Sequence, residues 1–183
     1  VDAVLKRIVP PGVLRRYARA LSVRNPVGRD QLCDLLTTGG YRRFDLVERK
    51  GDYSVRGHIV DFFPSHLEAP VRVEFFGDVV ESIREFDVET QRSSRHLGTV
   101  DILPMREVLI EERDIPEVMG RVRESASAQG VREAEIRRLE NLLSTVRYFP
   151  GVEMLGPLVW PRMAHLFDYV PPNAILVVDE ADE

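Results

Sequence analysis

Cysteine is nearly missing from this sequence, since Cys33 is the only one among 183 residues. A single cysteine excludes an internal disulfide and a zinc site built from several cysteines. We therefore expect Cys33 to be a small, buried apolar side chain on a helix.

Long apolar runs are missing as well. No stretch approaches the roughly 20 apolar residues of a membrane span, and the opening residues, VDAVLKRIVPPG, lack the apolar segment of a signal peptide. These two absences predict a cytoplasmic protein without a membrane segment.

Catalytic motifs are also missing. The four histidines are scattered without metal-ligand spacing, and no serine lies in a GxSxG motif. Asp61 and Glu74 fall on neighbouring predicted strands, but two carboxylates without a pocket are weak evidence for acid–base chemistry. We therefore predict no catalytic residue, no metal site, no cofactor and no enzymatic activity in this chain.

The segment AILVVDEADE, residues 174–183, is the strongest hint of nucleotide chemistry. It is typical of a buried parallel strand, and it is similar to the strand of nucleotide-driven helicases in which Asp179 would hold Mg²⁺ and Glu180 would orient water. The glycine loop GxxxxGK[ST] that cradles phosphates is absent, so an ATPase would need a further segment. A lone parallel strand also lacks a partner here. We therefore expect a piece of a larger α/β domain, cut from a longer protein.

The net charge of −5 hides an asymmetry along the chain. Residues 1–50 contain 11 Lys and Arg against 5 Asp and Glu, whereas residues 51–183 contain 14 against 25. Basic side chains of the first part are candidates for phosphate contacts. They are Arg15, Arg16, Arg19, Arg24, Arg29, Arg42 and Arg43. No aromatic residues interleave with the first four, so a solvated basic edge is the alternative to a DNA-contacting surface.

The first part of the chain predicts one helix and a series of strands. Residues 30–38 place leucines at helical spacing and are followed by Gly39 and Gly40, which predicts a helix that ends there. Before it, residues 1–9 predict a short helix or turn ended by two prolines, and residues 15–25 predict a strand. After Tyr41, the alternating runs 44–50, 53–55, 57–63, 70–76 and 79–86 predict an antiparallel meander that ends near residue 104.

The second part predicts helices. Asp114 is a candidate cap for a helix that runs toward Gly130, and residues 131–146 predict a second helix. Their apolar stripes are Ile115, Val118 and Val122 in the first helix and Leu139, Leu142, Leu143 and Val146 in the second. A short helical piece is expected at residues 163–167.

The run PVRVEFF, residues 70–76, has two different faces as a strand. Val71, Val73 and Phe75 alternate with Arg72, Glu74 and Phe76. We expect Val73, Phe75 and the following Val80 to be buried.

The next residues, Phe76-Gly77-Asp78-Val79, predict a hairpin with a two-residue loop. A regular ladder would pair Phe76 with Val79, Phe75 with Val80, Glu74 with Glu81 and Arg72 with Ile83. Two opposed glutamates repel each other, so the polar face is a candidate for contact with an outside partner. The alternative is that Arg72 bridges the glutamates and Phe76 covers the sheet edge.

Three longer strings carry a family resemblance: YSVRGHIVDFFP, PVRVEFFGDVVESIREFDVETQRS and DILPMRE. Together they resemble the N-terminal UvrB-homology region of bacterial transcription-repair coupling factors. The pattern RG-x-x-x-D-x-FP followed by R-x-E-FF is shared with the excision-repair protein UvrB. The strings FD-x-x-TQRS and LP-x-x-E are similar to the coupling factor instead. The resemblance is strong over residues 41–107 and extends over nearly the whole chain.

The resemblance implies a fold class and a division of the chain. Residues 17–104 would be an α+β module, a small antiparallel-sheet domain with a packed helix, like domain 2 of UvrB. Residues 1–16 and 105–183 would belong to a neighbouring α/β domain that resembles a helicase fold without its nucleotide site.

The resemblance also implies a partner and a site. The positions through which the family binds UvrA fall on Arg56, Arg72 and Phe76, and we expect them to form a solvent-exposed patch. The chain would be a non-catalytic adaptor that recruits UvrA to stalled RNA polymerase in nucleotide excision repair. Other domains of the full-length protein would contact RNA polymerase and DNA. The alternative is a DNA-contacting module that uses the basic N-terminal third.

Overall fold

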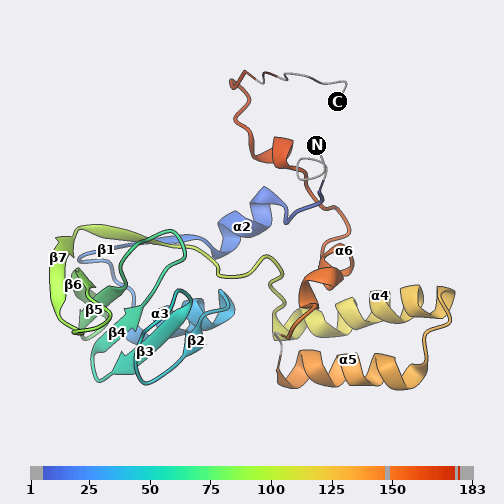
Figure 1. Ribbon diagram of the computed structural model, residues 1–183, viewed down its shortest axis with the longest axis horizontal. Coiled ribbons are helices and arrows are strands. Elements are labelled where there is room, and N and C mark those ends of the chain that lie inside the picture. Colours follow the sequence, from blue (N-terminus) through green and yellow to red (C-terminus); the bar gives the residue numbers. More distant parts are fainter. Residues whose placement is uncertain (1–5, 147–148, 176, 178–183) are drawn as a thin grey trace.

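The computed structural model describes residues 6–146, 149–175 and 177. Figure 1 shows strands packed with helix α3 (Arg29–Thr38) on one side of the molecule, and helices α4 (Ile115–Ala128) and α5 (Glu133–Thr145) on the other. Helices and a mainly antiparallel sheet occur together, which confirms the predicted α+β class. Within the described residues, no helix is both long and apolar enough to cross a membrane.

The central element is a six-stranded sheet in the order β2-β3-β4-β5-β6-β7. Its strands are β2 (Arg42–Arg43), β3 (Asp52–Arg56), β4 (Ile59–Phe62), β5 (Val71–Phe76), β6 (Val79–Phe86) and β7 (Ser93–Leu97). Neighbours from β3 to β7 are antiparallel, whereas β2 pairs in parallel with β3. The predicted meander is therefore confirmed from β3 onward.

The predicted strand at residues 44–50 is wrong, because this segment is a loop. The Asp52 carboxylate accepts hydrogen bonds from the backbone N–H groups of Glu48 (3.2 Å) and Arg49 (2.8 Å). The loop ends at Gly51, whose φ of 93° is a conformation that favours glycine. Local turn chemistry therefore prevails over the alternating pattern of the segment.

The strand predicted at residues 15–25 is wrong in its first part. Helix α2 (Pro11–Tyr17) has proline in its first turn, where a missing N–H costs nothing. Strand β1 (Arg19–Ser22) follows and pairs antiparallel with β8 (Thr99–Ile102) in a separate two-stranded sheet. Of the helix or turn predicted at residues 1–9, the first five residues lie outside the described part, and Ile8 forms an isolated antiparallel bridge with Ala164.

Helix α3 packs on the sheet and confirms the helix predicted at residues 30–38. Leu32 and Leu36 are fully buried in a core that also holds Val73, Phe75 and Val80, as predicted. Cys33 lies on the same helix, half-buried against this core, and burial raises the pKa of its thiol. The inward phase of β5 is therefore confirmed.

The hairpin between β5 and β6 departs from the regular ladder. Phe76 pairs with Val79 and Phe75 with Val80, as predicted, but a bulge next to Glu74 then shifts the register. Glu74 faces Ser82 and Arg72 faces Arg84, so the predicted pairs of Glu74 with Glu81 and of Arg72 with Ile83 are wrong. The bulge leaves Glu81 out of the ladder and removes the repulsion between opposed carboxylates.

A second hydrophobic core lies among the C-terminal helices. Helix α4 is confirmed, with Ile115, Val118 and Val122 buried, although the side chain of Asp114 makes no capping hydrogen bond. Helix α5 buries Ile136 and Leu143 and half-buries Leu139 and Leu142. The stripe predicted for α5 is wrong at Val146, which is exposed because the helix ends at Thr145.

The last part of the chain differs from its prediction. The remaining short helices are η1 (Glu112–Asp114), η2 (Val152–Leu155), α6 (Gly156–Val159) and η3 (Leu166–Tyr169). The short helical piece predicted around residues 163–167 is found as η3, which begins three residues later than predicted. Of the predicted strand at 174–183, Ile175 and Val177 are exposed and not in a strand. Asp179 and Glu180 lie outside the described residues.

Candidate docking face of the sheet

The face of the sheet opposite α3 carries two rows of mostly polar side chains. Antiparallel pairing aligns Ser54, Asp61, Arg72 and Arg84 across β3 to β6 in one row. The next row of the same face aligns Arg56, Ile59, Glu74 and Ser82. Phe76 follows Glu74 on this face, two residues further along β5. We call this surface the docking face.

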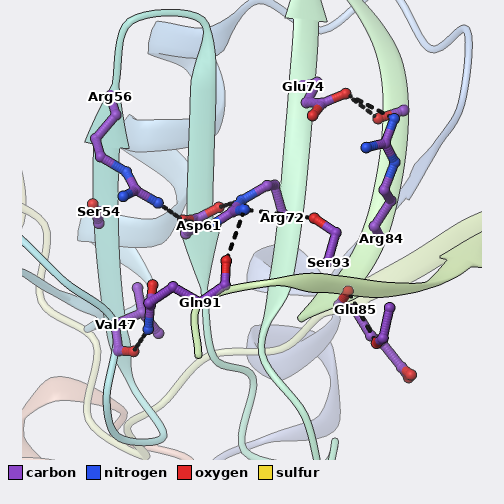
Figure 2. A network of polar contacts seen from close by, with 12 residues as sticks. Val47, Ser54, Arg56, Asp61, Arg72, Glu74, Arg84, Glu85, Gln91 and Ser93 are labelled. Carbon is purple, nitrogen blue, oxygen red and sulfur yellow. Dashed lines mark hydrogen bonds and ion pairs between the residues drawn. The ribbon is translucent and has the colours of Figure 1, made fainter. Parts of the chain in front are cut away.

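Asp61 is the centre of the docking face. Its side chain is only 2% exposed. As Figure 2 shows, guanidinium groups reach it from both neighbouring strands. Arg72 donates from Nε to Oδ1 (2.8 Å) and from Nη2 to Oδ2 (2.9 Å), and Arg56 donates from Nη2 to Oδ2 (2.6 Å). A buried carboxylate needs such partners, because an unpaired buried charge is strongly unfavourable.

Arg72 lies deep in the docking face. Its side chain is 13% exposed, and its Nη1 donates to the backbone carbonyl of Gln91 (3.2 Å). The guanidinium also lies 4.8 Å from the centre of the Phe86 ring, where a cation is attracted by the π-system. The hydrogen bonds to Asp61 raise the pKa of Arg72 above its usual value. The predicted exposure is therefore wrong for Arg72, because the connection from β6 to β7 covers it.

Arg56 is the more accessible arginine. It ends β3, and the turn that follows contains Gly57 with a φ of 59°. The side chain is 44% exposed, and Asp61 is the partner that holds its Nη2. Because nearly half of the side chain stays accessible, Arg56 combines an orientation held by Asp61 with a cationic surface that an approaching molecule can reach.

Phe76 is the main apolar feature of the docking face. It is 78% exposed, at the end of β5 beside the Gly77-Asp78 turn, and its cross-strand partner Val79 is also exposed. Glu74 precedes it by two residues on the same face, accepts a hydrogen bond from the Ser82 hydroxyl (2.7 Å) and pairs with Arg84 (3.2 Å). The prediction of an outward Phe76 is confirmed.

The sequence did not identify every residue that shapes this face. Asp61 drew attention only as a possible acid–base partner of Glu74, whereas both carboxylates are engaged by arginines. The Asp of RG-x-x-x-D-x-FP was the available signal for it. Phe86, Gln91 and Ser93 all lie in the string FD-x-x-TQRS, but strand alternation did not show that they meet Arg72, because the path of the β6–β7 connection brings them to it.

The rest of the described chain offers little alternative chemistry. Among the residues that the structure describes, no group of three or more His, Cys, Asp or Glu side chains is arranged to hold a metal ion. Basic side chains of the N-terminal third lie on different elements, and Arg29 is paired with Asp30 at 2.7 Å.

An α+β module that exposes a phenylalanine and a half-exposed arginine on one face of its sheet has the features of a protein-interaction domain. Comparison with known families agrees, because residues 20–107 match the family model of the UvrB interaction domain. These residues belong to that family, and the chain as a whole is related to one segment of the transcription-repair-coupling factors.

Three relatives show the extent of this relationship. The chain is 30% identical over 181 residues to the transcription-repair-coupling factor of Haemophilus influenzae, covering 97% of this chain and 15% of the relative. It is 37% identical over 158 residues to that of Myxococcus xanthus, covering 86% and 13%. It is 30% identical over 178 residues to that of Escherichia coli, covering 97% and 15%. The chain thus spans about 15% of the length of these relatives.

Proposed function

We propose that this chain is the UvrA-docking region of a transcription-repair coupling factor and acts as a non-catalytic adaptor in the cytoplasm. In this role it recruits UvrA to lesions at which RNA polymerase has stalled, for nucleotide excision repair. Other parts of the full-length protein contact RNA polymerase and DNA. The observation that carries the proposal is the exposed Phe76 on the same sheet face as the half-exposed Arg56.

The chemistry of the docking face suits a protein partner. Aromatic side chains such as Phe76 act as anchors that fill an apolar pocket of the partner. Arg56 has outward donors for charge-assisted hydrogen bonds to a carboxylate. The pairing of Glu74 with Arg84 is locally neutral, so the excess charge of the face is positive. UvrA would therefore present an acidic group beside an apolar pocket.

The proposal includes the division of the chain. Residues 17–104 are the docking module, and residues 1–16 and 105–183 belong to a neighbouring, degenerate helicase-like α/β domain. Two observations support it. The buried residues of the first core come from residues 21–102, and those of the second from residues 108–152.

The test is the affinity for purified UvrA, measured by titration calorimetry on the wild-type chain and on Phe76→Ala. Loss of an aromatic anchor typically costs about 2 kcal/mol or more, which is about a thirtyfold weaker affinity. The melting temperature should stay unchanged, because an exposed phenylalanine contributes little to the core.

The matched control is Phe167→Ala, which removes another exposed phenylalanine, on η3 and away from the docking face. It should bind UvrA like the wild type. Unaltered binding by Phe76→Ala, or an equal loss in both variants, would contradict the proposed function.

A further inference from the structure

Asp61 differs from every other acidic side chain that the structure describes. Among the described residues it is the only charged one that is buried, at 1% exposure. It lies on β4, between Arg56 on β3 and Arg72 on β5. A docked protein has almost no access to Asp61, so any effect of this residue on docking must pass through the side chains that it holds.

We propose that Asp61 is a positioning residue that sets the orientation of both arginines of the docking face. This inference rests on the proposed function. Both carboxylate oxygens are used, since Oδ1 accepts from Arg72 while Oδ2 accepts from Arg72 and Arg56. The two-point contact with Arg72 fixes the plane of that guanidinium. The hydrogen bond from Arg56 Nη2 to Oδ2 then holds Arg56 against a carboxylate whose position Arg72 has already fixed.

The charges explain why the shared carboxylate matters. One negative charge lies between two positive ones, so the three residues keep one net positive charge. That charge is most accessible at Arg56, because Arg72 is covered by the Gln91 turn and the Phe86 ring. Without Asp61 the two guanidinium groups would repel each other, and the exposed Arg56 would turn into solvent. Docking would then include the cost of ordering Arg56 again.

Stability alone does not account for this arrangement. A buried ion pair typically contributes little more to folding than well-packed apolar residues of similar volume. A network that holds a half-exposed arginine in one orientation has a use in recognition, because a preorganised side chain loses less entropy on binding.

The test is the affinity of Asp61→Asn for UvrA, measured in the wild-type background and again in an Arg56→Ala background. Asparagine keeps the shape of the side chain but removes its charge and one acceptor. We expect about tenfold weaker binding in the wild-type background, roughly the cost of ordering one long side chain. In the Arg56→Ala background, the same change should have a clearly smaller effect, because the coupling between contacting residues is lost.

The control is Glu85→Gln, which removes the ion pair of Glu85 with Arg95 (2.6 Å) elsewhere on the sheet. It should leave UvrA affinity unchanged in both backgrounds. An equal effect of Asp61→Asn in both backgrounds would overturn the positioning role and indicate a purely structural one. Wild-type affinity of Asp61→Asn, alongside weak binding by Phe76→Ala, would overturn this inference and leave the proposed function intact. Absence of UvrA binding by the wild-type chain would overturn the proposed function itself.

A second variant covers the case in which Asp61→Asn does not fold. Arg56→Lys keeps the positive charge at a half-exposed position but lacks the planar fork that Asp61 orients. Weaker UvrA binding by a folded Arg56→Lys supports the inference. Wild-type binding by this variant would show that the charge alone suffices and would overturn it.

Discussion

Arg72 and Arg56 share one carboxylate but differ in what surrounds them. Arg72 contacts Asp61, the Gln91 carbonyl and the Phe86 ring, and its side chain is largely covered. Arg56 has the Asp61 contact and keeps 44% of its side chain exposed. The two residues should therefore contribute differently to stability, although both belong to the docking face.

We predict that Arg72→Ala destabilises the fold by about 3 kcal/mol or more, because it leaves the buried Asp61 with only one partner. Arg56→Ala should cost less than about 1 kcal/mol, because half-exposed ion pairs contribute little. Urea unfolding of both variants measures the difference. Equal losses of stability would mean that Arg72 is not the structural member of the pair.

Tyr17 gives a prediction about alkaline pH. It is buried and donates to the Glu111 carboxylate (2.9 Å), and burial followed by this contact raises its pKa. A group whose pKa is raised on folding stabilises the protein fully below its unfolded value, near pH 10, and loses that contribution as the pH rises further. We expect stability to fall above about pH 10.

Tyr17→Phe removes the titrating group, so its stability should fall less steeply above that pH. At pH 7 the variant should be about 1 kcal/mol less stable, since it lacks the hydrogen bond. Urea unfolding at pH 8 and pH 11 measures both effects, and an unchanged slope in Tyr17→Phe would contradict the assignment. Both proteins should still lose some stability above about pH 10, because burial raises the pKa of the Tyr41 phenol too.

At the residue level, the sequence predicted on which face of the sheet each β5 side chain lies, but it did not predict how exposed each side chain is. Strand parity placed Arg72 and Phe76 on the same side, and that is where they lie. Parity holds no information about the β6–β7 connection, which covers Arg72 and leaves Phe76 free. The exposure of a strand residue depends on such distant segments, so the three predicted residues differ in accessibility.

At the level of elements, one extra residue in the β5–β6 hairpin lets two apolar residues at odd spacing both face the core. Val80 and Ile83 are both buried, although an odd spacing would place them on opposite faces of a regular strand. The bulge that leaves Glu81 unpaired restores their common direction and places Ser82 opposite Glu74. The odd spacing of Val80 and Ile83 was therefore a signal for the bulge, and the prediction of a regular ladder did not take it into account.

Two single-residue deletions test this account. Deletion of Glu81 should leave a regular ladder with Ser82 still opposite Glu74, and the protein should fold with nearly wild-type stability. Deletion of Ser82 yields the same length but places Glu81 opposite Glu74. It should be about 1 kcal/mol or more less stable, because like charges oppose each other and a hydrogen bond is lost. Thermal unfolding compares them, and equal stabilities would refute the role of the bulge.

Elements with strong local signals were predicted best. Helix α3 has leucines at helical spacing and a glycine stop, and its prediction was off by one residue at its start. Residues 44–50 have a strand-like pattern, but hydrogen bonds to Asp52 hold them as a loop. The pattern around Tyr17 favoured a strand, but the prolines at residues 10 and 11 begin a helix that includes it. In both cases a local signal, the Asp52 carboxylate or the two prolines, prevails over the alternating pattern.

At the scale of the whole molecule, the two larger hydrophobic cores of the described residues draw on separate stretches of the chain. The partly buried residues that pack on the first core extend only from Val23 to Met105, and those on the second from Leu139 to Trp160. The hydrogen bond of Tyr17 with Glu111 is one of the links between the two stretches. A chain built in this way has the features of two folding units.

We therefore predict that residues 17–107 fold alone and bind UvrA with the affinity of the whole chain. Their core holds all the buried residues of the six-stranded sheet's inner face, and β1 and β8 stay paired within the fragment. Urea unfolding of the fragment, followed by far-UV circular dichroism, should be cooperative and should coincide with one of two transitions that the whole chain shows by the same probe. The single tryptophan packs against the second core, so its fluorescence reports on the other unit. A fragment that is unfolded in water, or a single transition of the whole chain seen equally by both probes, would show that the helical part is needed to hold the docking face together.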